Sequence, residues 1–144
     1  AQKHPDAGSL VTLFMGGNGI GGGMVINGRL WTGASGYCSE VGFLPVYERL
    51  NKGSLGLPPA EHISELYARL IQIYAVTVNP HMMVLYRHPL LEGRLDEIRR
   101  LCASYLPSKA IPSIELSYDY QQDYEKGLFT VAKSMGQAVS EGGL

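Results

Sequence analysis

The part of the sequence that decides the fold is a glycine-rich stretch, Gly16-Gly17-Asn18-Gly19-Ile20-Gly21-Gly22-Gly23. Six of its eight residues are glycine, and apolar runs at residues 10–15 and 22–26 flank it. Glycine loses more backbone entropy on folding than other residues. Such a stretch therefore persists where the chain turns with positive φ or where another group approaches its amides closely. The sequence predicts a β-hairpin with a glycine-rich bend.

The bend also has a chemical interpretation. Consecutive amide N–H groups in a glycine-rich turn form a concave nest that holds an anion, typically a phosphate oxygen. A tight turn with no ligand explains the glycines as well. Two nucleotide motifs are excluded, because no Lys-Ser or Lys-Thr follows and no helix opens directly after the glycines. On the residues alone, an anion site and an unliganded turn both stay open.

The remaining elements follow from apolar periodicity and turn residues. The predicted order is a return strand at 29–31 after the Asn27-Gly28 turn, a loop over 33–56, a helix from Pro58-Pro59 to Asn79-Pro80, a strand at 82–86, a helix around 95–105, a strand at 111–117 and a helix from 120 to about 139. The inward face of the first helix is expected to carry Ile63, Leu66, Tyr67, Leu70, Ile73, Tyr74 and Thr77. Strands that alternate with helices predict an α/β fold with a mixed sheet.

Size and composition limit the class of protein. With 144 residues, we expect one domain over residues 9–144, preceded by a polar tail over 1–8. Charged residues make up 17% and the net charge is -1, so we expect no direct binding of nucleic acid. No apolar run approaches the ~18 residues needed to span a bilayer, and no secretion signal is visible, which predicts a cytoplasmic protein that does not bind membranes. Cys38 and Cys102 lack metal-ligand spacing and are expected to be reduced thiols.

Two segments carry a family resemblance. Residues 17–30, continuing through Gly33-Ala34-Ser35-Gly36 to Ser39-Glu40-Val41-Gly42, resemble the ROK family of repressors and sugar kinases. In that family a G-T-G-I-G-x-G hairpin binds ATP phosphates, and a G-A-x-x-x-A-G-E-x-G-H segment contacts the sugar. Weaker matches lie at residues 79–85 and 127–129. The resemblance covers most of this chain but only the C-terminal half of a complete member, and it implies an RNase H-like lobe of the actin-like ATPase type.

The resemblance also implies site residues. The phosphate-binding residues would be Gly17, Asn18, Gly19, Ile20 and Gly21. The sugar-binding residues would be Gly33, Ala34, Ser35 and Glu40. A carboxylate such as that of Glu40 suits a sugar because it accepts two charge-assisted hydrogen bonds from hydroxyl groups. A solvated loop carboxylate is the alternative for Glu40.

The chain departs from the family in four ways. The N-terminal lobe with its D-x-G-x-T loop and catalytic aspartate is absent, so we expect no catalytic residue here and no ATP or magnesium unless that lobe is present. Phe43 stands where the family has a histidine that binds sugar and zinc. The zinc-binding cysteine segment is missing, so structural zinc is not expected. Tyr86-Arg87 replaces two glycines and would crowd a nucleotide base.

Three functions remain open. The first is a lobe without catalytic activity that senses a sugar or sugar phosphate, or forms a homodimer, within a transcriptional regulator. The second is half of an ATP-dependent sugar kinase whose N-terminal lobe is missing. The third is a purely structural dimerisation module.

Overall fold

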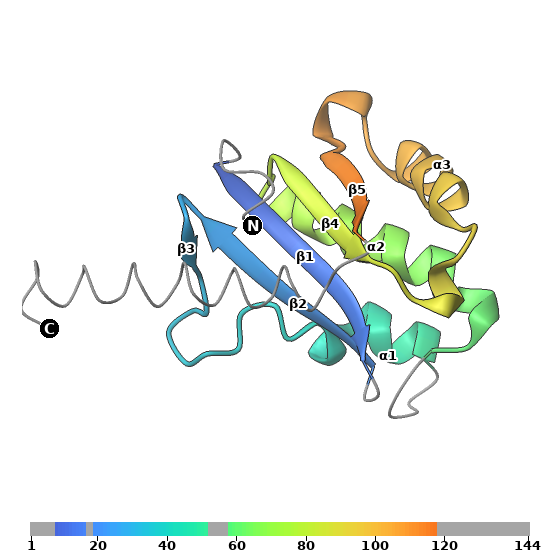
Figure 1. Ribbon diagram of the computed structural model, residues 1–144, viewed down its shortest axis with the longest axis horizontal. Helices are drawn as coiled ribbons and strands as arrows, with labels where there is room; N and C mark the ends of the chain where they lie inside the picture. The colour runs from blue at the N-terminus through green and yellow to red at the C-terminus, as the bar shows by residue number, and fades with distance from the viewer. Residues whose placement is uncertain (1–7, 17–18, 52–57, 118–144) are drawn as a thin grey trace, which may run out of the picture.

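A computed structural model of the protein describes residues 8–16, 19–51 and 58–117 (Figure 1). Its strands are β1 (Ser9–Gly16), β2 (Gly19–Ile26), β3 (Arg29–Leu30), β4 (Met82–Tyr86) and β5 (Ser113–Ser117). Its α-helices are α1 (Pro45–Asn51), α2 (Ile63–Thr77) and α3 (Leu95–Tyr105). Single 3-10 turns are η1 (Val41–Phe43), η2 (Ala60–His62), η3 (Pro89–Leu91) and η4 (Ser108–Ala110). The predicted tail and the predicted last helix lie outside the described residues.

The strands form one mixed sheet in the order β3-β2-β1-β4-β5. The hairpin strands β1 and β2 are antiparallel, whereas β4 lies beside β1 in parallel and β5 lies beside β4 in parallel. Each parallel pair is joined by a crossover that contains helices, α1 and α2 before β4 and α3 before β5. The predicted α/β class and mixed sheet are confirmed.

All three helices pack on the same face of the sheet (Figure 1). Side chains alternate along a strand, so Val11 and Leu13 of β1 share this face with Met83 and Leu85 of β4. A second, smaller cluster lies on the other face and contains Leu10, Val84 and Tyr86. The two clusters explain why β4 is apolar at every position, because both faces of this strand are buried.

The sequence predicted the strands and the two longer helices of the described residues, although several of their bounds differ from the prediction. Asn27 and Gly28 both have positive φ, 51° and 78°, which confirms the turn that returns β2 into β3. The strand at 82–86 and the helix around 95–105 are confirmed. The prediction of a plain loop over 33–56 was wrong, because α1 lies within it. The predicted inward face of α2 is also wrong at two positions, since Ile73 is only half-buried and Thr77 is exposed.

Candidate functional site

The connection between β1 and β2 is shorter than the sequence indicated. Gly16 pairs with Gly19, and β2 continues through Ile20 and Gly21, which pair with Met15 and Phe14. Gly19, Ile20 and Gly21 therefore lie in the sheet, whereas residues 17 and 18, which connect β1 to β2, lie outside the described residues. Gly19 has a φ of 117°, a conformation that favours glycine strongly. The prediction that residues 17–21 bind a phosphate stays a prediction.

Close packing explains part of the glycine richness. A Cβ on Gly21 would lie 2.5 Å from the ring of Phe14, the residue opposite it on β1. A Cβ on Gly22 would lie 3.0 Å from the carbonyl oxygen of Ser39 and 3.2 Å from the hydroxyl of Tyr74. A side chain at either position would collide with the Phe14 ring or with the loop at Ser39, which both lie against β2. Close packing therefore accounts for the absence of a side chain at Gly21 and Gly22.

The start of β2 is anchored to α1. The backbone N–H of Ile20 donates a buried hydrogen bond of 3.0 Å to the hydroxyl of Tyr47. This amide is therefore engaged within the protein, although the resemblance places it among the phosphate donors. Tyr47 was missed at the sequence level because α1 was missed. The signal that could have found it is Pro45 followed by Tyr47 and Leu50, apolar residues three apart that both reach the core.

The predicted sugar loop is a fixed structure between β3 and α1. The N–H of Cys38 donates to the carbonyl of Thr32 at 3.0 Å and closes residues 32–38 into a loop. Gly33 and Gly36 have φ values of 80° and 82°, so both positions favour glycine. Ala34 and Ser35 lie between them and are exposed. Three of the predicted sugar-binding residues, Gly33, Ala34 and Ser35, therefore share one exposed loop tip.

Glu40 follows this tip at the start of η1. Its N–H donates to the carbonyl of Tyr37 at 3.1 Å, and its carbonyl accepts from the N–H of Phe43 at 3.2 Å. Val41, the next residue, is buried in the core and fixes the turn. The Glu40 side chain is exposed, and its carboxylate has no hydrogen-bond or ion-pair partner within the described ranges. A rigid backbone thus presents a carboxylate that is available to a ligand.

The sugar loop and the glycine hairpin meet. Ser39, with a φ of 71°, lies directly against Gly22 of β2, and its side chain hydrogen-bonds to the hydroxyl of Tyr74 on α2. Burial raises the pKa of Tyr74, and this hydrogen bond partly offsets the rise. Ser39, the residue before Glu40, is therefore held between β2 and α2. The contact joins the hairpin to the loop that precedes Glu40, although neither Ser39 nor Gly22 is among the predicted site residues.

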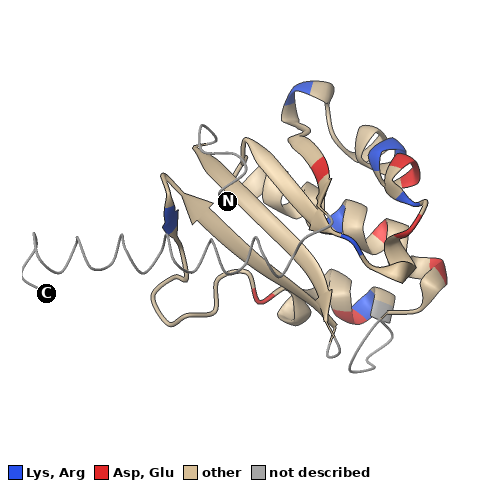
Figure 2. Cartoon of the chain, in the orientation of Figure 1, with Lys and Arg blue, Asp and Glu red and all other residues tan. Residues whose placement is uncertain are grey.

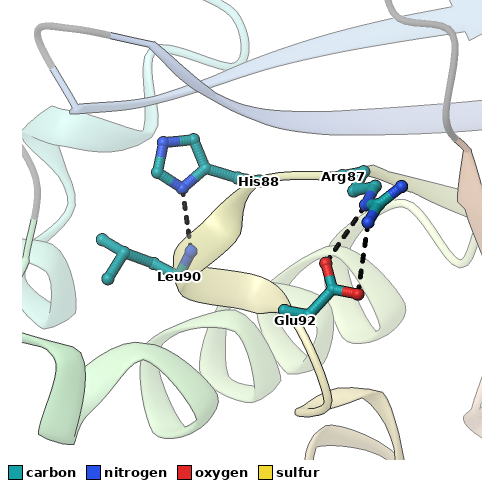
Figure 3. Close-up of polar contacts among 4 residues, drawn as sticks. All are labelled: Arg87, His88, Leu90 and Glu92. Atoms are coloured by element: carbon teal, nitrogen blue, oxygen red, sulfur yellow. Dashed lines mark hydrogen bonds and ion pairs between the residues drawn. The ribbon is translucent and has the colours of Figure 1, made fainter.

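The turn after β4 lies at the same edge of the sheet as the glycine bend, because β1 and β4 are parallel. Figure 3 shows the side chains of His88 and Arg87 pointing away from each other on this turn. Arg87 makes two hydrogen bonds to the Glu92 carboxylate, of 3.1 and 3.3 Å. The Nδ1 atom of His88 accepts from the N–H of Leu90 at 3.1 Å and caps η3. Where the family has two small glycines, this chain has the buried Tyr86 and an ion-paired arginine.

Basic and acidic residues are interspersed along the described part of the chain. In Figure 2 positive and negative residues alternate over α2, α3 and the turns beside them. Within residues 8–16, 19–51 and 58–117, no three histidine, cysteine or acidic side chains come together as a metal site. Among the helices in these same ranges, none combines the length and apolar character needed to cross a bilayer.

Comparison with known proteins identifies the fold. No sequence-family profile and no curated protein sequence matches the chain. Among solved structures, it resembles a ROK family protein from Streptococcus pneumoniae TIGR4 in complex with sucrose, at 15% identity and a TM-score of 0.57. It also resembles a proposed sugar kinase from Cytophaga hutchinsonii ATCC 33406, at 16% identity and a TM-score of 0.54. The fold is therefore the RNase H-like, actin-like lobe that the sequence predicted.

The match is to part of each neighbour. It covers 79% and 89% of this chain but only 54% and 57% of the two solved chains. The chain therefore spans little more than half the length of the proteins it resembles. Their activities as whole proteins are not shown for this chain.

Proposed function

We propose that this chain is the C-terminal lobe of a ROK-type, sugar-kinase-like protein, and that it recognises a sugar or sugar phosphate through the loop that carries Glu40. On its own the lobe does not catalyse phosphoryl transfer. As part of a transcriptional regulator it would sense the sugar. The fold supports this proposal, and so does the solved neighbour, whose crystal structure is a complex with sucrose.

The observation that carries the proposal is the state of Glu40. Its backbone is held by two hydrogen bonds and by the neighbouring Ser39 and Val41, while its carboxylate is exposed and has no partner in the described part of the chain. A fixed carboxylate accepts hydrogen bonds from two adjacent sugar hydroxyls without first breaking an ion pair. A merely solvated loop carboxylate needs no such fixed backbone.

Titration of the 144-residue chain with a panel of hexoses and hexose phosphates, followed by calorimetry or NMR, tests the proposal. We expect weak binding, with a dissociation constant on the order of 1 mM, because an open lobe buries little of a ligand. Glu40→Gln should weaken binding about tenfold, since hydrogen bonds to a charged group are worth about 1.5–3 kcal/mol. Glu48→Gln, the same change at an exposed position of α1, should leave it unchanged. Equal affinities for the two variants would refute the role of Glu40.

The second candidate is half of an ATP-dependent sugar kinase, and the hairpin favours it. The bend between β1 and β2 lies at the carboxyl-terminal edge of β1 and β4, where ligands bind in open α/β sheets. ATP and magnesium would then act only with the missing lobe, and structural zinc is not required. Adding that lobe in cis or in trans and assaying hexose phosphorylation separates a kinase half from a sensing lobe.

Exposed apolar residues favour a homodimer as a further role of the lobe. Ile26, Leu30 and Trp31 are exposed at the β2–β3 edge of the sheet, and β3 is only two residues long. Apolar side chains that lie exposed together are typical of surfaces that bind another protein chain, here a second copy. Sedimentation at several concentrations tests this role, and a strict monomer at every concentration would exclude it.

A further inference from the structure

The most unusual surface feature among the described residues is a pair of exposed aromatic rings beside Glu40. Phe43 is 79% exposed and Tyr37 is 66% exposed. Their ring centroids lie 6.0 Å apart at an interplanar angle of 64°, an edge-to-face contact. Single exposed apolar residues need no explanation, but two rings held in mutual contact with their other faces in water mark a binding surface.

The pair is fixed by the same backbone hydrogen bonds that fix Glu40. The Tyr37 carbonyl accepts from Glu40 N–H, and the Glu40 carbonyl accepts from Phe43 N–H. Tyr37, Glu40 and Phe43 therefore stand on two consecutive tight turns. Neighbouring residues anchor these turns, because Val41 is buried and Ser39 lies against β2. Since the rings contact each other before any ligand arrives, binding needs little further ordering of these side chains.

We propose that Tyr37 and Phe43 form a stacking platform for the apolar face of a sugar ring whose hydroxyls bind Glu40. A pyranose has a face of C–H groups and a rim of hydroxyl groups. The negative face of an aromatic ring attracts the weakly positive C–H groups, while a carboxylate accepts from the hydroxyls. This inference rests on the proposed function and names a contact that uses Phe43, the residue found in place of the family's histidine. The platform would favour sugars that present several C–H groups on one face.

Saturation-transfer NMR on the 144-residue chain tests the platform directly. Irradiation of aromatic protein protons in the presence of a binding hexose should saturate C–H protons on one face of the sugar most strongly. Phe43→Ala and Tyr37→Ala should each weaken binding about two- to tenfold, the range expected when an aromatic contact is lost. Phe43→Trp should restore the affinity, whereas Phe43→Leu, which keeps an apolar side chain without a ring, should not.

Controls separate this inference from the proposed function. The thermal midpoint of Phe43→Ala should equal that of the wild type, because the side chain is largely exposed. Val76→Ala, a change at another exposed apolar side chain on α2, should leave sugar binding unchanged. If the wild type binds a sugar and Phe43→Ala binds it equally well, the platform is wrong and the proposed function stands. If the wild type binds no sugar, both are wrong. If Phe43→Ala instead turns a dimer into a monomer, the rings form a protein interface and the platform is wrong.

Discussion

Two buried tyrosines, Tyr47 and Tyr67, lie close together in the core but differ in their hydroxyl groups. The Tyr47 hydroxyl accepts the N–H of Ile20 and ties α1 to the strand that leaves the glycine bend. The Tyr67 hydroxyl is fully buried and has no hydrogen-bond partner among the described residues. Burial, with a smaller contribution from Tyr47, raises the pKa of Tyr67 well above its usual value. The Tyr47 hydroxyl therefore stabilises the contact between α1 and β2, whereas the unpaired Tyr67 hydroxyl lowers the stability of the fold.

Replacing each tyrosine with phenylalanine should therefore give opposite results. Tyr47→Phe leaves the Ile20 amide buried without a partner and should destabilise the protein by about 1–3 kcal/mol. Tyr67→Phe removes an unpaired hydroxyl and should be neutral or stabilising by up to about 1 kcal/mol. Urea unfolding of both variants beside the wild type measures the two effects. A larger loss in Tyr67→Phe than in Tyr47→Phe would contradict the assignment.

The thiol of Cys102 gives the stability a pH dependence. Burial between α2 and α3 raises the pKa of Cys102 to about 11, from an ordinary 9.0. Below pH about 9 both folded and unfolded chains hold the proton, so this group does not make stability depend on pH. Between about 9 and 11 only the folded state keeps it, so the free energy of unfolding should fall as pH rises, by up to about 2 kcal/mol. Denaturant titrations at several pH values from 8 to 10.5 measure this. The free energy of unfolding of Cys102→Ala should fall less steeply with pH than that of the wild type.

At the scale of elements, the candidate site depends on how closely the loop between β3 and α1, which carries Ser39 and Glu40, crosses β2. Gly22→Ala would place a Cβ 3.0 Å from the backbone oxygen of Ser39, and backbone yields less easily than a side chain. Overpacking of this kind should cost about 1–3 kcal/mol. Gly42→Ala is the control, since nothing lies within 4 Å of its Cβ position. It should be neutral or stabilise by about 0.4–1 kcal/mol through a less flexible unfolded chain. Equal stabilities for the two variants would mean that the loop does not rest on β2.

The same contact shows why the sequence predicted the strands but only part of the site. The strand Met82–Tyr86 is a continuous apolar run, and the Asn27-Gly28 turn is a local signal, so both were predictable. The partners of Gly21 and Gly22 are brought close by tertiary packing, and periodicity does not reveal them. Helix α1 was missed because seven residues with two buried apolar positions give a weak helical pattern.

The candidate site residues were chosen through the family resemblance rather than through chemistry, and their binding role stays a prediction. Glu40 is an ordinary loop carboxylate in the sequence, and its fixed backbone becomes visible only in the structure. The exposure of Tyr37 and Phe43 was not predictable, because apolar residues in a sequence are expected to be buried. Trp31 is also exposed, at 53%, and lies outside the core.

At the scale of the whole molecule, the described residues present one edge of an open sheet. Because β1, β4 and β5 run in parallel, their carboxyl ends share that edge with the glycine bend and the Arg87–Glu92 pair. In sheets of this kind, ligands bind in a crevice outside the carboxyl ends of the strands. The match covers 54% and 57% of two solved chains, so each neighbour contains further chain beyond the part that this fold matches.

Under the proposed function, the 144-residue chain should bind a sugar without catalysing phosphoryl transfer. Phosphoryl transfer needs a nucleophile, a base, metal and phosphates held together, and positioning supplies most of the acceleration. We therefore expect no sugar-dependent consumption of ATP by the 144-residue chain in a coupled assay of ADP release, even at sugar concentrations that saturate the NMR titration. Glu40→Gln would then bind the sugar about tenfold more weakly while its ATP consumption stays at the buffer level, as in the wild type. Sugar-dependent ADP release by the wild type, abolished in Glu40→Gln, would instead show a complete catalytic centre within these residues.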